Sequence, residues 1–148
     1  MTALSSHLSL FISAFLAATL LPGSSEVMLA GLVLLDPAST ATLFIAATVG
    51  NTAGAAVNWY LGRSFMHFAG RRWFPVTTDR LDQASAFFNR YGSWPLLFSW
   101  APIVGDPLTV AAGALHIRFP LFLPLVAVGK AARYAIVIAG VEIARVAS

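Results

Sequence analysis

The sequence predicts an all-α integral membrane protein: an inverted repeat of two re-entrant helical hairpins, each followed by a transmembrane helix, with an amphipathic cytoplasmic connector. Three observations support this fold class: an apolar composition, two apolar segments broken at their centres, and landmarks that recur in both halves of the chain. Of 148 residues, 58% are hydrophobic and 10% are charged, whereas a soluble domain carries about 25% charged residues. The mean hydropathy is +0.78. Lipid must therefore cover much of the surface, and we expect a single membrane domain over 1–148.

Two apolar segments are long enough to span a bilayer without interruption. The segment 37–62 holds no charged residue, and 119–141 holds only Lys130 and Arg133. A helix needs about 20 residues to cross the hydrocarbon core, so each segment is predicted to form one transmembrane helix. Between them, 63–90 carries five arginines, and the positive-inside rule places such a segment in the cytoplasm.

Two further apolar segments are broken near their centres. The first, 7–35, is interrupted at Pro22, and the second, 93–117, at Pro102; a glycine follows each proline within three residues. Proline removes a helical hydrogen bond, and glycine allows the chain to reverse. Each half is too short to span alone, so both segments are predicted to be re-entrant hairpins. Two long, kinked spanning helices remain the alternative.

The two halves of the chain repeat the same landmarks in the same order. Pro22 and Glu26 stand four residues apart, as do Pro102 and Asp106, at an offset of 80 residues. A Val-Gly pair follows in each half. Interrupted segments at matching positions of two halves indicate a transporter site at the repeat interface.

The predicted topology follows from the arginine-rich segment. Repeat 1 covers about 7–62, the connector 63–92, and repeat 2 about 93–145. With the connector inside the cell, one hairpin enters from outside and the other from inside, so the halves are inverted and both chain termini lie outside. Within the connector, apolar residues at helical spacing predict an amphipathic helix on the inner leaflet, for which a solvated linker is the alternative; these residues are Leu81, Ala84, Phe88 and Tyr91.

Four ionisable side chains fall inside the membrane segments: Glu26, Asp106, Lys130 and Arg133. Each such charge costs at least ~2.5 kcal/mol by insertion scales and usually faces a cavity or a partner. We expect these four to carry transport and proton coupling around a polar midplane cavity. The alternative is a neutral ion-pair network that only locks the hairpins to the spans. The residues predicted to line the cavity are Pro22, Gly23, Ser24, Asn51, Pro102 and Gly105.

Five stretches of the chain together resemble the DedA family. They are Leu20–Val27, Val49–Asn51, Arg90–Gly92, Pro102–Asp106 and Gly129–Tyr134. DedA proteins are the bacterial branch of the SNARE-associated Golgi or VTT-domain membrane proteins, and the resemblance is greatest to the small YqaA-like branch. It implies opposed re-entrant hairpins and a multi-pass location in the bacterial inner membrane. It also implies lipid translocation by a flippase or scramblase, since some members carry lipids such as undecaprenyl phosphate.

The chain departs from the pattern of larger family members at two places. Ser24 stands where they have the acid of a Pro-Gly-Asp hairpin tip, and the acid of this chain comes two residues later. Ser99 and Gly105 stand where they have the arginines of an Arg-x-x-Pro-x-x-Arg pattern. Those phosphate-binding arginines therefore have no counterpart here, and Lys130 and Arg133 on the adjacent helix are the cations available to replace them.

We expect a DedA-like transporter that translocates lipid, with protons as the candidate coupling ion. A proton- or ion-coupled transporter of small molecules is one alternative, and a structural membrane-assembly subunit without transport is another. Membrane lipids, protons and a second copy of the chain in a homodimer are the expected partners. A nucleic-acid partner is not expected, because the arginines gather in one stretch, which indicates a signal for membrane topology rather than a nucleic-acid-binding surface.

No enzymatic activity, cofactor or metal is expected. The chain has no cysteine, which excludes disulfides and thiolate metal sites. A nucleophilic serine needs an activating base, but His7, His67 and His116 lie near predicted segment ends. Three scattered histidines do not form a metal-ligand cluster.

Overall fold

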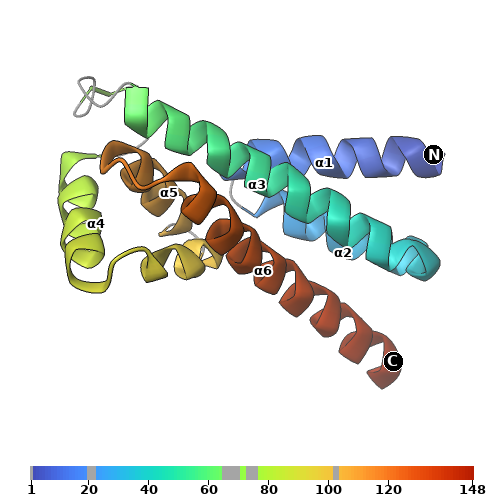
Figure 1. The fold of residues 1–148 in the computed structure, drawn as a ribbon. Helices are drawn as coiled ribbons and strands as arrows, with labels where there is room; N and C mark the ends of the chain where they lie inside the picture. Colours follow the sequence, from blue (N-terminus) through green and yellow to red (C-terminus); the bar gives the residue numbers. More distant parts are fainter. Residues whose placement is uncertain (1, 20–22, 65–70, 73–76, 102–103) are drawn as a thin grey trace. The chain divides into compact units, whose positions relative to one another are not determined.

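The computed structural model describes residues 2–19, 23–64, 71–72, 77–101 and 104–148. Over these residues the chain is helical and contains no strand, so the predicted all-helical class is confirmed (Figure 1). The elements in chain order are α1 (Ala3–Thr19), α2 (Ser24–Leu35), the 3-10 helix η1 (Pro37–Ser39), α3 (Thr40–Ser64), α4 (Thr78–Tyr91), the 3-10 helix η3 (Trp94–Trp100), α5 (Gly105–Ala114) and α6 (Phe119–Ala147).

The chain divides into two compact units. The first unit comprises Met1–Gly54 and Lys130–Ser148, and the second unit comprises Ala55–Gly129. The boundaries fall inside α3 and α6, so each of these long helices contributes one part to each unit.

Two helices among the described residues are long and apolar enough to cross a bilayer. One is Pro37–Ser64, formed by η1 and α3 over 28 residues, and the other is α6, with 29 residues. Both exceed the about 20 residues that a span requires. The helices predicted at 37–62 and 119–141 are therefore confirmed as helices, and α6 continues beyond the predicted end to Ala147.

The first broken segment forms two short helices, as predicted. α1 and α2 pack against each other within the first unit. Gly23 immediately precedes α2 and has a φ of 95°, a left-handed conformation that glycine adopts without steric penalty. Pro22 lies outside the described residues.

The second broken segment also forms two short helices, and its first half is a 3-10 helix. Gly92, with a φ of 67°, ends α4, and Ala101 is extended with a ψ of 128°, as expected before a proline. The stretch between them is short and contains Pro95, which has no N–H to donate. The tighter 3-10 turn satisfies the remaining groups over such a short length, through bonds such as Leu96 N to Ser93 O at 3.1 Å.

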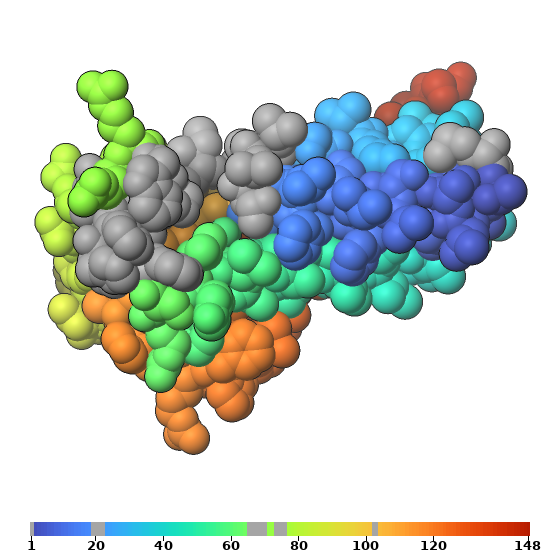
Figure 2. All heavy atoms as spheres, turned by 90° about the horizontal axis from the view of Figure 1, so that it is seen from above, coloured from blue at the N-terminus to red at the C-terminus, as the bar shows by residue number. Residues whose placement is uncertain are grey.

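The core of the first unit forms where α1, α2, α3 and α6 meet. α1 runs alongside the first part of α3 (Figures 1 and 2). Close approach is possible because α3 carries glycine there: a Cβ at Gly50 would meet the carbonyl of Phe11, and one at Gly54 would lie 2.6 Å from the Cβ of Ala18. The buried apolar residues of this core are Leu10, Ala14, Leu29, Val33, Leu43, Ala47 and Tyr134.

The core of the second unit forms around α4, η3 and α5, which pack on one another. The amphipathic helix predicted in the connector is confirmed as α4, with Leu81, Ala84 and Phe88 buried. Tyr91, the fourth residue of the predicted apolar face, is 50% exposed, and the location of the helix at the inner leaflet stays a prediction. Tyr91 is the last residue of α4, where the helix ends at Gly92 and the chain leaves the packed face.

Candidate functional site

Glu26 and Arg133 form an ion pair between α2 and α6 in the first unit, with Arg133 Nη2 bound to Glu26 Oε1. Their side chains are 16% and 14% exposed, respectively. Glu26 lies in the first turn of α2, where the positive end of the helix dipole favours a carboxylate. Arg133 lies at the middle of α6. A charge at the middle of a helix long and apolar enough to cross a bilayer calls for a partner, and Glu26 supplies it.

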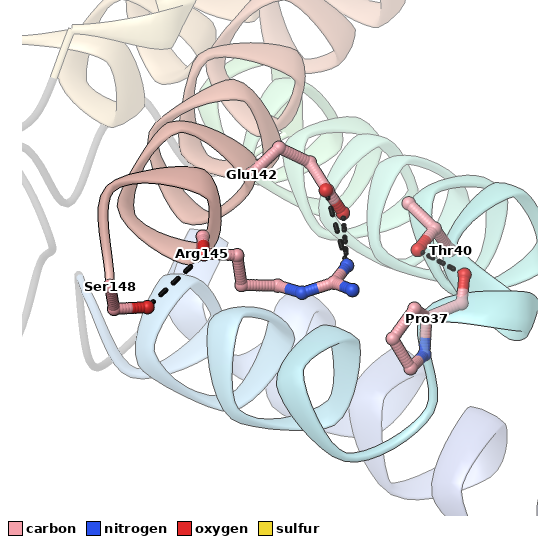
Figure 3. Close-up of polar contacts among 5 residues, drawn as sticks. All are labelled: Pro37, Thr40, Glu142, Arg145 and Ser148. Atoms are coloured by element: carbon pink, nitrogen blue, oxygen red, sulfur yellow. Dashed lines mark hydrogen bonds and ion pairs between the residues drawn. The ribbon is translucent and has the colours of Figure 1, made fainter.

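A second ion pair, at the end of α6, is more exposed to solvent than the Glu26–Arg133 pair. Arg145 donates to both carboxylate oxygens of Glu142 at 3.1 Å, and the Ser148 hydroxyl donates to the Arg145 carbonyl (Figure 3). The two charged side chains are 42% and 45% exposed. Solvent screens such pairs to about 0–1 kcal/mol, so this contact does little more than order the helix end.

A chain of buried hydrogen bonds leads from α3 to the carboxylate of Glu26. Asn51 Nδ2 donates to the Tyr134 hydroxyl at 2.9 Å. The Tyr134 hydroxyl lies 2.9 Å from Ser25 Oγ, and Ser25 Oγ donates to Glu26 Oε2 at 3.3 Å. Ser25 and Tyr134 are 0% exposed and Asn51 is 2% exposed. We call these four residues, Asn51, Tyr134, Ser25 and Glu26, the relay.

The direction of the relay follows from counting protons. A hydroxyl group carries one proton, and that of Ser25 is donated to Glu26. Tyr134 must therefore donate in its bond with Ser25, and it accepts from Asn51. All three protons point toward the carboxylate, so the arrangement suits an ionised Glu26.

Three more of the predicted site residues lie in the first unit. Lys130 lies one turn before Arg133 on α6, and its side chain is 1% exposed. Gly23 precedes α2. Ser24 begins α2 and is exposed, whereas its neighbour Ser25 is buried and joins the relay.

Asp106 and Gly105 belong to the second unit. Asp106 lies in the first turn of α5, and its backbone carbonyl accepts from Thr109 Oγ1 at 2.7 Å. The Thr109 hydroxyl in turn accepts from Asn58 Nδ2 at 3.2 Å. Gly105 is buried against Ser99, whose carbonyl a Cβ would meet. Pro102 lies outside the described residues.

Two residues of the relay, Ser25 and Tyr134, were not among the predicted site residues. Each stands next in the sequence to a predicted charge, Glu26 or Arg133. Hydroxyl groups beside a charge in an apolar segment are the signal that sequence reasoning could have used, because buried polar groups need hydrogen-bond partners.

The second unit contains a groove of about 810 Å³ between α4, η3 and α5. Asp79, Arg80 and Gln83 line it from α4, while Phe98 and Leu108 supply apolar surface from the other elements. A mostly apolar hollow with a few polar groups is typical of ligand sites.

Comparison with known proteins identifies the family. The VTT domain matches residues 21–142. The chain belongs to the VTT-domain, or DedA, family. The resemblance stated from the motifs is thereby confirmed. The chain is a membrane protein, and the two long apolar helices that end at Ser64 and Ala147 fit this membership.

Relatives across bacteria match most of the chain. It is 40% identical over 131 residues to "Inner membrane protein YqaA" of Escherichia coli (strain K12), covering 88% of this chain and 87% of that protein. It is 35% identical over 132 residues to an uncharacterized protein of Haemophilus influenzae, covering 84% of this chain and 80% of that protein. An uncharacterized membrane protein of Mycobacterium tuberculosis is 31% identical over 133 residues, covering 82% of this chain and 56% of that protein. No solved structure shows significant similarity to the chain.

Proposed function

We propose that this chain is a bacterial inner-membrane transporter of the DedA type that translocates lipid, with the Glu26–Arg133 pair as its charged centre and protons as the coupling ion. The observation that carries the proposal is the ion pair at the middle of α6, where Arg133 is held by Glu26 of α2. The location rests on the family and on the name of the E. coli relative, "Inner membrane protein YqaA".

The chemistry of the pair suits an exchange of anions. A guanidinium group binds a carboxylate or a phosphate through the same planar fork. In the structure the guanidinium group of Arg133 is bound to the carboxylate of Glu26. When a proton binds to Glu26, the attraction between the two side chains is lost and Arg133 becomes available to the phosphate of a lipid headgroup. Loss of the proton restores the pair and releases the headgroup.

The groove in the second unit also supports a lipid substrate. It combines apolar surface from Phe98 and Leu108 with the charged side chains of Asp79 and Arg80. This combination matches an amphiphile, which has an apolar chain and a charged head.

A structural assembly subunit is the second candidate, favoured by the relay that ties Glu26 to α3 and α6. Such a network would lock α2 in place without any transport. The two functions differ in one measurable respect, namely whether the protein moves lipid between leaflets.

The test of transport uses purified protein in vesicles with fluorescent phospholipid in both leaflets. A membrane-impermeant reductant bleaches only the outer leaflet, about half of the label, in protein-free vesicles. We expect bleaching to proceed well beyond half when the protein is present and to accelerate when a pH difference is imposed. Bleaching that stops at the level of protein-free vesicles, with the protein folded and inserted, would contradict lipid translocation.

We also propose the inverted arrangement of the two repeats, with both termini outside and the arginine-rich connector inside. A reporter that works only outside the cytoplasm is expected to be active when it is fused to either terminus. A reporter that works only in the cytoplasm is expected to be active when it is inserted beside Arg71. Arg71 and Arg72 are exposed, and they are among the five arginines that are expected to hold the connector inside. Four complete spans would place both termini in the cytoplasm with the connector, so terminal reporters active there would overturn the hairpin arrangement.

A further inference from the structure

We infer that the relay is reversible: it has one orientation for ionised Glu26 and a second for protonated Glu26, and the side-chain amide of Asn51 turns between them. This inference rests on the proposed function, because it names the device that lets the charged centre take up a proton. The atom that points to it is Asn51 Oδ1, which is buried and has no hydrogen-bond partner among the described residues.

The unpartnered oxygen is unexpected in a network that is otherwise complete. Asn51 Nδ2 is bound to Tyr134, and this bond fixes the amide so that Oδ1 points elsewhere. A buried amide oxygen without a partner loses the hydrogen bonds that it had in water and destabilises the folded state. Each such group in a native structure calls for an explanation, and a second orientation of the relay provides one.

The second orientation satisfies every group of the relay. Protonated Glu26 carries its proton on Oε2 and donates it to Ser25 Oγ, which can then no longer donate to Glu26. Ser25 donates instead to the Tyr134 hydroxyl, and Tyr134 donates onward. Its acceptor is Asn51 Oδ1, brought to it by a half-turn of the amide, which exchanges the nitrogen and oxygen at nearly constant shape.

The turned amide also needs a hydrogen-bond acceptor for its N–H groups, and the Thr48 hydroxyl is proposed as that acceptor. Thr48 lies three residues before Asn51 on α3, a spacing that puts side chains on one helix face. Its hydroxyl oxygen is buried and likewise has no partner among the residues that the structure describes. Only one covalent bond forms in the whole change, the O–H of Glu26; the hydroxyl protons move by rotation about their C–O bonds.

The charges around Glu26 set which orientation prevails. On α6, Arg133 contacts Glu26 directly, and buried Lys130 lies one turn earlier on the same helix. α1 carries only His7, which is bound to Thr42 near the start of α3, nine residues before Asn51, and α3 has no ionisable residue between Thr40 and Gly54. The orientation in the structure is the one in which Arg133 contacts the Glu26 carboxylate, and the second orientation forms when a proton arrives. Tyr134 and Asn51 are thus positioning residues, because they complete the hydrogen bonds that stabilise protonated Glu26.

The test titrates Glu26 directly, by infrared difference spectroscopy of the purified full-length protein in lipid nanodiscs. The signal is the carboxylic-acid C=O band that acidification produces and that Glu26→Gln abolishes. Asn51→Leu leaves the bonds to ionised Glu26 intact but removes the acceptor that the second orientation needs. Tyr134→Phe breaks the relay one bond closer to Glu26 with little change of volume, because the Ser25 hydroxyl then has no acceptor. Both variants are expected to shift the midpoint of the band to more acidic pH by about one unit, the size that a lost buried hydrogen bond implies.

The control is Thr52→Val, which removes a buried hydroxyl of α3 outside the relay and is expected to titrate like the parent. If Asn51→Leu does not fold, Tyr134→Phe decides the question alone. Midpoints unchanged in the folded variants would overturn the inference, as would the absence of any Glu26-dependent band at every pH where the protein stays folded. The proposed function is tested separately by lipid movement in vesicles, so a shifted midpoint without transport rejects the function and leaves the relay standing.

Discussion

Arg133→Leu is expected to lower the free energy of unfolding by about 3–5 kcal/mol, the usual consequence of removing one partner of a buried ion pair. The variant leaves Glu26 buried on α2 without the guanidinium that it contacts. The carboxylate then keeps only its hydrogen bond from Ser25 and stays charged without a counter-ion, or it takes up a proton at the expense of folding. Denaturant titration of the detergent-solubilised protein, followed by tryptophan fluorescence, measures the change.

Two controls separate the charge effect from simple loss of packing. The double variant Glu26→Gln/Arg133→Gln removes both charges and is expected to recover most of the lost stability, because two amides can bond to each other and no charge remains buried. Arg145→Leu breaks the exposed pair with Glu142 and is expected to cost less than about 1 kcal/mol. A double variant as unstable as Arg133→Leu would show that the ion pair is not what holds α2 to α6.

The positions of the long helices could be predicted because they depend on local signals. The uncharged run 37–62 and the almost uncharged run 119–141 are helices in the structure, since apolar length alone specifies such elements. The break before α2 could also be predicted, because Gly23 supplies the left-handed residue that precedes the helix. The helical character of Trp94–Trp100 was predicted as well, but not its tighter 3-10 form.

The site could be predicted only in part, because its contacts are tertiary. Charges in an apolar chain must find partners, so the sequence pointed to Glu26 and Arg133 as members of one cluster. It could not say which acid meets which cation, since 107 residues separate these two. Whether Ser24 or Ser25 joins the relay depends on the rotation of α2 about its axis, and no local sequence pattern determines that rotation. The inverted relation of the two repeats stays a prediction.

Arg133→Lys is expected to abolish lipid transport while leaving membrane insertion intact. Lysine keeps the charge but presents a single ammonium group, which does not reproduce the planar fork of arginine toward a carboxylate or phosphate. We expect the rate to fall at least about tenfold, the factor that corresponds to roughly 1.4 kcal/mol of lost interaction. The vesicle assay with fluorescent phospholipid measures this rate.

The matched control for Arg133→Lys is Arg71→Lys/Arg72→Lys. These arginines are exposed and outside the helices, where each acts as one positive charge worth about 1 kcal/mol of attraction to anionic lipid. Lysine supplies the same charge, so transport is expected to stay near the parent level. Equal losses in both variants would mean that arginine is needed for membrane association and not at the charged centre.

We propose that the Glu26–Arg133 pair is the working centre of a transporter and not merely a lock between α2 and α6. The most direct measurement is the lipid transport rate of the folded double variant Glu26→Gln/Arg133→Gln in vesicles, beside the parent at equal protein density. Removing both charges preserves the packing of the two helices but takes away the proton acceptor and the anion-binding group. We expect the double variant to show the rate of protein-free vesicles, and a rate equal to that of the parent would overturn the role of the pair in transport.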